Sequence, residues 1–344
     1  MDTQNLLKKL TSEIGISGYE YDFSRAVKKI LDEYCAKTIV EKSGNVKGFF
    51  TPFDKTKKTV LLEAHLDRIG LVVSEILEGG FLKFRAMGGV DERILPASDV
   101  LILGREVCFG VIGAVPPHLK GISAKDKNSP QISDMLIDTG MSVENVRKKI
   151  SVGDPILLKS EILELADGRV SSAALDNRAG MAAIFECLKI IGEKDPVVNV
   201  RIAFTVGEEL GLQGARTLID QDLPDLVVVV DVTHGRTHDS EKNDTFELGC
   251  GAVICRGPNL HYELTNKIID VAKEKGLPFE IEVAAGNTGT NAWALQVSGS
   301  GVPCTLVSIP LRYMHTTVET ISKDDVSTVG RLLAEIVLGG DVIA

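Results

Sequence analysis

Short apolar segments that alternate with helical patterns are the feature that most constrains how this chain folds. Residues 226–232 read Leu-Val-Val-Val-Val-Asp-Val, and such a run is typical of a strand buried on both faces of a sheet. Similar apolar runs occur at 59–65, 198–206 and 303–309. Apolar residues at helical spacing occur at 178–191, 212–220, 259–275 and 323–338. This alternation predicts an α/β fold, an α/β/α sandwich whose sheet is largely parallel and carries helices on both faces.

A β-rich block interrupts the alternation. From about residue 69 to 165 the segments are short and separated by glycines, with one helical pattern near 143–150. We therefore predict two domains. Residues 1–67 and 168–344 form a discontinuous α/β domain, and residues 68–167 form an inserted small β-domain that is either barrel-like or sandwich-like.

The charge balance excludes some classes of partner. The chain has 344 residues, with 38 Lys plus Arg and 48 Asp plus Glu, so its net charge is −10. A basic face is needed to bind nucleic acid or anionic lipid, so we expect no nucleic-acid and no membrane partner. The N-terminal residues lack the apolar run of a signal peptide, and no apolar stretch is long enough to span a bilayer. The six cysteines are scattered without a C-x-x-C pair, which indicates a cytoplasmic protein.

Histidine and acidic side chains stand at or just beyond the ends of predicted strands, the edge at which open α/β sheets bind ligands. They occur in five places, which are His65 with Asp67, Asp176, Glu208 with Glu209, Asp231, and His315. Each place alone has an ordinary structural alternative, such as a turn, a helix cap, a solvated first helical turn or a surface histidine. Their coincidence at strand ends is what indicates a site.

Three of these places are typical of a cation site. Asp231 follows four valines, and a carboxylate buried there without a partner costs several kcal/mol. Glu208 and Glu209 are adjacent, and neighbouring carboxylates repel each other unless a positive group holds at least one of them. Asp67 lies two residues after His65 in an extended segment, so it can accept one ring N–H and leave the other nitrogen for a metal.

Apart from Asp67, these places together offer two histidines, three carboxylate ligands and one spare carboxylate. This mixture suits Zn²⁺ or Co²⁺, with Mn²⁺ as a third choice, better than Ca²⁺ or Mg²⁺. One metal with all five ligands would leave no position for water. Two metals that share one carboxylate would each have three protein ligands, and such pairs, roughly 3.5–4 Å apart, suit hydrolysis.

The other histidines fit ordinary positions better. His234 and His238 follow Asp231 in a polar loop and are further candidate ligands, but we interpret them as loop or substrate-side residues. His118 and His261 lie in or beside segments that contain proline, and we interpret them as structural or surface residues.

Seven strings carry a family resemblance. They are S-G-Y-E from Ser17, A-H-L-D-R-I-G from Ala64, G-V-I-G-A-V-P-P-H-L from Gly110, D-M-L-I-D-T-G from Asp134, A-L-D-N-R-A-G from Ala174, G-E-E-L-G-L-Q-G-A from Gly207 and I-P-L-R-Y-M-H-T from Ile309. In this order and spacing the chain resembles the tetrahedral, or TET-type, dinuclear metalloaminopeptidases, which include glutamyl and deblocking aminopeptidases and FrvX-like proteins. The resemblance covers nearly the whole chain.

The resemblance implies a zinc-peptidase-like fold with a PDZ-like dimerisation domain in the inserted region. The implied metal ligands are His65 and Asp231 for one ion, Glu209 and His315 for the other, and Asp176 as the bridge, followed by a cis peptide bond to Asn177. Glu208 is the implied general base, and Asp67 is the carboxylate behind His65. The implied activity is removal of N-terminal residues from short peptides by a water that bridges the two metals. The implied partners are copies of the same chain, in dimers that assemble into a hollow dodecamer.

The chain departs from the family pattern at Arg68, where an acid is frequent, and at Asn291, where Asp is common. The second change removes a charge near the expected substrate pocket, so it bears on substrate preference. Two other functions stay open, which are a glycosidase of the endoglucanase type with paired carboxylates and a non-catalytic homologue that acts as a binding protein.

Overall fold

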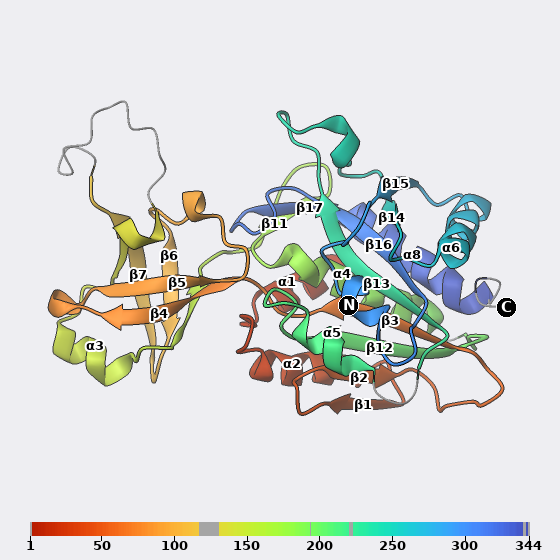
Figure 1. Cartoon of the computed structure of the whole chain (residues 1–344), viewed down its shortest axis with the longest axis horizontal. Helices are drawn as coiled ribbons and strands as arrows, with labels where there is room; N and C mark the ends of the chain where they lie inside the picture. The colour runs from red at the N-terminus through yellow and green to blue at the C-terminus, as the bar shows by residue number, and fades with distance from the viewer. Residues whose placement is uncertain (1, 117–130, 193, 220–222, 340–341, 343–344) are drawn as a thin grey trace.

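Figure 1 shows a β-barrel at one end of the long axis of the molecule and a layered α/β unit at the other. The structure is a computed structural model, which describes residues 2–116, 131–192, 194–219, 223–339 and 342. Among these residues, no helix has both the length and the apolar character that a membrane span requires.

An eight-stranded sheet is the middle layer of the α/β unit. Its strands, in spatial order, are β1 (Lys37–Val40), β2 (Val46–Phe49), β12 (Asn199–Thr205), β3 (Thr59–His65), β13 (Leu226–His234), β16 (Cys304–Leu311), β14 (Ala252–Arg256) and β15 (Phe279–Val283). The four central strands, β12, β3, β13 and β16, are parallel, as the apolar runs predicted. The sheet as a whole is mixed, because β2 and β14 join these central strands antiparallel.

Helices cover both faces of this sheet, which confirms the predicted sandwich. Along β3, Val60, Leu62 and Ala64 pack into one core and Leu61 into another, since successive side chains of a strand point to opposite faces. The first core lies under α1 (Thr3–Thr11), α2 (Tyr21–Leu31), α4 (Leu175–Ile191), α6 (Tyr262–Glu274) and α8 (Lys323–Gly339). The second lies under α5 (Gln213–Leu218) and α7 (Ala292–Leu295). Helix α6 begins later than predicted because His261 is its N-cap and accepts a hydrogen bond from Leu264 N.

The inserted region is a closed six-stranded barrel, so the barrel alternative was correct and the sandwich alternative wrong. Its strands are β4 (Gly70–Ile76), β5 (Leu82–Met87), β8 (Met135–Asp138), β7 (Val107–Ala114), β6 (Asp99–Leu103) and β9 (Pro155–Leu158), and β9 closes the barrel on β4. The barrel has its own apolar core, to which α3 (Val143–Lys149) contributes Val146. The exact limits at 68 and 167 stay a prediction.

A small three-stranded sheet joins distant parts of the chain beside the site. It consists of β10 (Leu163–Glu164), β11 (Arg169–Ser172) and β17 (Glu319–Ser322). Strand β11 leads into α4, and β17 leads into α8. Ser172 pairs with Glu319 in antiparallel register, so the start of α4 lies next to the segment that follows β16.

Candidate metal centre

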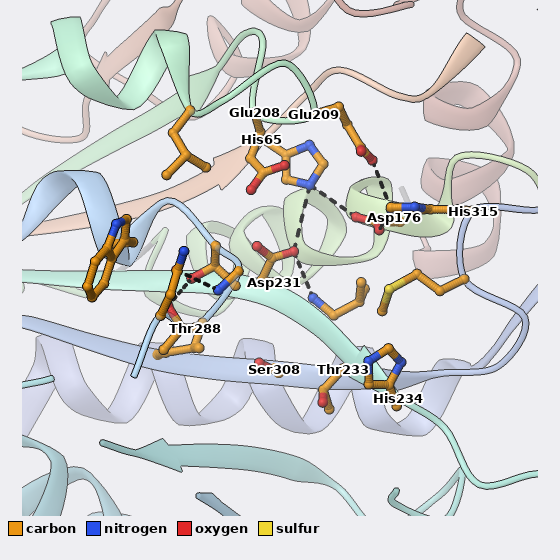
Figure 2. Close-up of a pocket in the computed structure, with 18 of the residues that line it drawn as sticks. His65, Asp176, Glu208, Glu209, Asp231, Thr233, His234, Thr288, Ser308 and His315 are labelled. Atoms are coloured by element: carbon orange, nitrogen blue, oxygen red, sulfur yellow. Dashed lines mark hydrogen bonds and ion pairs between the residues drawn. The ribbon is translucent and has the colours of Figure 1, made fainter. Parts of the chain in front are cut away.

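The predicted site residues meet at the carboxyl edge of the central strands (Figure 2). His65 is the last residue of β3, Asp231 lies in β13, and Asp176 is the second residue of α4. Glu208 and Glu209 lie in the turn between β12 and α5, and His315 follows β16. Two groups of ligand atoms form, His65–Asp176–Asp231 and Asp176–Glu209–His315, with the atoms of each group within 4.8 Å of one another.

Asp176 belongs to both groups and offers a different oxygen to each. Its Oδ1 lies 3.0 Å from His65 Nε2, and its Oδ2 lies 3.3 Å from His315 Nε2. His65 Nε2 is also 3.7 Å from Asp231 Oδ1, and His315 Nε2 is 3.2 Å from Glu209 Oε1. The peptide bond from Asp176 to Asn177 is cis, as the resemblance implied. A carboxylate that faces two separate clusters in this way has the geometry of a bridging ligand.

The second ring nitrogen of each histidine has a protein partner. His315 Nδ1 lies 3.0 Å from the carbonyl oxygen of Gly89, which comes from the barrel. His65 Nδ1 lies 3.2 Å from the carbonyl oxygen of Asp67 and 3.5 Å from its carboxylate Oδ1. When these partners accept Nδ1–H, both Nε2 atoms are free to bind a cation.

The Asp67 carboxylate also holds the turn that carries the two adjacent acids. It accepts hydrogen bonds from Glu208 N at 2.9 Å and Glu209 N at 3.1 Å, and from the hydroxyl of Ser17 at 2.6 Å. Glu20 accepts a further bond from Gly207 N at 2.9 Å. Buried carboxylates therefore fix the backbone of this turn and the direction in which its side chains point.

Sequence reasoning missed three buried acids around the site, which are Glu20, Glu63 and Glu319. Glu63 lies inside β3 and accepts hydrogen bonds from Thr205 Oγ1 at 2.6 Å and Asn291 Nδ2 at 2.8 Å. Glu319 accepts hydrogen bonds from Asp176 N and His315 N. The sequence did contain a signal for Glu63, because it is a charged residue inside an apolar run, and the same observation identified Asp231.

The electrostatics of the cluster show an excess of negative charge. Burial raises the pKa of Glu208 to about 8, and the charges of Glu209, Asp176 and Asp67 add to the shift against the opposing effect of His65. Burial also raises the pKa of Asp231 well above its usual range. Burial acts the other way on His315, but its hydrogen bonds to Asp176 and Glu209 outweigh this and raise its pKa to about 11. In the absence of cations the cluster therefore retains protons.

Two divalent ions fit this arrangement. They would take the place of the retained protons, and the nitrogen and oxygen donors suit Zn²⁺, Co²⁺ or Mn²⁺. The cluster lines a cavity of about 520 Å³, large enough for the end of a peptide. Among the described residues, neither group of ligand atoms includes His234, His238 or a cysteine, although His234 lines the cavity. His118 lies outside the described residues.

The two departures from the family pattern have different surroundings. Gly289 and Thr290 line the cavity, but the Asn291 side chain is buried and donates hydrogen bonds to Glu63 and to Thr205 Oγ1, the latter at 2.9 Å. Its amide thus anchors the start of α7 to the sheet. Arg68 is buried, and burial lowers its pKa to about 10 against the opposing charge of Glu319.

Comparisons with known proteins agree with this geometry. The model of the M42 glutamyl aminopeptidase family matches residues 44–332. The lysyl aminopeptidase of Pyrococcus furiosus is 31% identical over 95% of this chain and 94% of its own length.

Two solved structures share the whole fold. An aminopeptidase from the archaeon Desulfurococcus kamchatkensis superimposes with a TM-score of 0.92 at 30% identity, over 99% of this chain and 96% of its own. The TET1 peptidase of Pyrococcus horikoshii has a TM-score of 0.86 at 29% identity, over 98% of this chain and 99% of its own, and can assemble into a tetrahedron or a large octahedral shell. Its cluster of histidine and carboxylate groups could hold metal ions, and the chain belongs to the M42 glutamyl aminopeptidase family and is a metalloaminopeptidase, a hydrolase that acts on peptide bonds.

Proposed function

We propose that this enzyme removes N-terminal residues from short peptides at a centre of two divalent ions. The observation that carries the proposal is the placement of Asp176, whose two oxygens face separate ligand groups. His65 and Asp231 hold one ion, Glu209 and His315 hold the other, and Asp176 bridges them. Zn²⁺ and Co²⁺ are the ions we favour, with Mn²⁺ as an alternative.

Two ions held by these residues would acidify the attacking water and polarise the carbonyl of the bond to be cleaved. The protein supplies the proton transfers. Glu208 takes a proton from the attacking water and delivers it to the leaving amine, which is the task of a general base that then acts as a general acid. Its half-buried position, among the residues that line the cavity, suits both halves of this task. The free α-amine of the substrate binds beside a carboxylate of the cluster, and this explains action at the N-terminus.

Asp67 acts behind these groups. It lies on the Nδ1 side of His65 and accepts hydrogen bonds from the backbone of Glu208 and Glu209. We propose that Asp67 orients both His65 and the general base, Glu208. This role needs the carboxylate to stay ionised, and the hydrogen bonds from His65, Ser17 and Glu208 lower its pKa although burial alone would raise it.

The decisive experiment separates metal binding from catalysis. Purified enzyme should contain or take up two ions for each subunit, and chelation should abolish hydrolysis of aminoacyl chromogenic substrates. The substitution Glu208→Gln should keep both ions and lower kcat by a factor of roughly 10²–10⁴. Glu280→Gln, at an exposed position of β15, is the matched control and should leave kcat unchanged. Turnover by fully chelated enzyme would reject the proposal.

We further propose that residues 68–167 form a separate domain through which copies of the chain associate into dimers and a hollow dodecamer. The closed barrel with its own apolar core supports a separate domain. The assembly of the Pyrococcus horikoshii relative into closed shells supports self-association. Such a shell would admit short peptides only. A cytoplasmic location also belongs to the proposal, because all six cysteines are free.

A further inference from the structure

One buried carboxylate joins the backbones of two proposed ligands. Glu319, the first residue of β17, is 2% exposed. Its Oε2 accepts a hydrogen bond from Asp176 N at 3.1 Å, and its Oε1 accepts one from His315 N at 2.9 Å. Each oxygen therefore serves a different ligand, and the two ligands come from segments that are far apart in the sequence.

Both ligands lie in turns that need such a contact. His315 itself has a φ of 62°, and Ala174, two residues before Asp176, has a φ of 64°. Residues other than glycine rarely adopt this left-handed backbone conformation, and surrounding contacts must hold it in place. The two N–H groups that donate hydrogen bonds to Glu319 lie within these turns, so the carboxylate restrains both turns.

The backbone of Glu319 is fixed by the same two segments. Glu319 pairs with Ser172 of β11, four residues before Asp176, and the next residue, Thr320, pairs with Arg312, three residues before His315. Strand β17 thus brings the side chain of Glu319 to a defined place between the two ligands. A residue so placed can set the distance between them.

We propose that Glu319 is a positioning residue that fixes the separation of Asp176 and His315 and so shapes the second ion position, formed by Asp176, Glu209 and His315. The inference rests on the proposed dinuclear function. Glu319 contacts neither ion nor substrate in this scheme. It acts through the two backbone N–H groups, because a displaced backbone would move both ligand side chains.

The chain offers a matched control in Asp325. This acid is also buried, and its two oxygens also accept two backbone hydrogen bonds, from Gly249 N and Gly251 N at 2.7 Å each. Neither glycine belongs to the proposed ligands. The substitution Asp325→Asn therefore makes the same chemical change in a comparable setting away from the ions.

The test is cobalt binding to the metal-free full-length protein. Wild type should bind two Co²⁺ ions for each subunit by calorimetry and by metal analysis. In Glu319→Gln the amide keeps one acceptor and turns a donor toward the other N–H, so one of the two contacts is lost. We expect the affinity of the ion at Asp176, Glu209 and His315 to fall by roughly 10–100-fold, as is typical when a partner of a ligand is removed, and the affinity of the other ion, which keeps His65 and Asp231 in place, to fall less. Asp325→Asn should bind both ions like wild type.

A second variant separates positioning from folding. Glu319→Asp keeps the charge but is one methylene shorter, so it should also weaken the binding of one ion more than that of the other, while its thermal midpoint stays near that of Asp325→Asn. Unchanged binding of both ions by Glu319→Gln would overturn the inference. The inference would also be overturned if both Glu319 variants lost both ions equally and lost the fold as well, because Glu319 would then serve general stability. Wild type that binds fewer than two ions would instead overturn the proposed dinuclear function.

Discussion

At the residue scale, the site concentrates buried acids that have few positive partners. Burial is the largest cause of the raised pKa of each of five carboxyl groups, those of Glu20, Glu63, Glu208, Asp231 and Glu319. A buried carboxylate is unfavourable unless donors or cations neutralise it. The metal-free protein therefore holds protons where the loaded protein would hold ions, and pH becomes a probe of the site.

We expect the thermal stability of the metal-free enzyme to fall as pH rises from about 5 to 8. In this interval unfolded Glu has lost its proton, since its ordinary pKa is 4.5, whereas folded Glu208 keeps its proton up to about 8. Above its ordinary pKa of 6.5, His315 acts in the same direction, because its folded pKa is about 11. The folded state then binds more protons than the unfolded state, so the free energy of unfolding decreases with rising pH.

The measurement is the thermal midpoint in chelating buffer between pH 5 and 8, repeated with excess Co²⁺. Ions replace the protons, so their stabilising effect should be largest at pH 8. A midpoint that rises with pH in the metal-free protein would contradict the electrostatics of the cluster.

Single residues also show how far sequence reasoning reaches. A charge next to four valines made Asp231 conspicuous, and the same reasoning applies to Glu63 within β3. Glu319 carries no comparable signal, because its strand is short and contains threonine and serine beside one isoleucine. Its importance depends on pairing with β11, a long-range contact that no local pattern encodes.

At the scale of elements, the ends of strands and the turns between them place the proposed ligands. The central strands were predictable because each is largely apolar. Strands β1 and β15 were not, since both are only half-buried and lack such a run. The role of the turn after β5 was also hidden, because its carbonyl oxygen at Gly89 reaches His315 only in the folded molecule.

This turn provides a test of how the barrel supports the site. In Gly89→Ala the added Cβ would lie 2.7 Å from His315 Nδ1, so the imidazole must shift. We expect weaker binding of one ion and a fall in kcat of roughly 10–100-fold with little change in thermal midpoint. Gly113→Ala, in β7 of the same barrel, is the control, because its Cβ would meet nothing within 4 Å. Equal kcat for both variants would show that the barrel turn does not hold His315.

At the scale of the whole molecule, the outer face of the barrel is apolar along β7 and β6. Val107, Phe109 and Val111 point outward along β7 and are 58%, 69% and 49% exposed. Leu101 and Leu103 of β6 pair with Phe109 and Val107, and both are half-buried. Contiguous exposed apolar side chains of this kind mark contact surfaces between proteins. We call these five residues the barrel patch.

The barrel patch is where we expect copies of the chain to associate. Phe109→Asp would place a charge in the contact, and burial of an unpaired charge costs several kcal/mol, so association should weaken by about 100-fold or more.

Tyr262→Asp is a matched control, because Tyr262 is an equally exposed aromatic residue, at 71%, on α6 of the other domain. Light scattering after size exclusion should give a large assembly for wild type and Tyr262→Asp, and smaller species for Phe109→Asp. Because the proposed ligands of both ions lie within one chain, Phe109→Asp should still bind two Co²⁺ ions. An assembly that survives Phe109→Asp would place the contact elsewhere on the molecule.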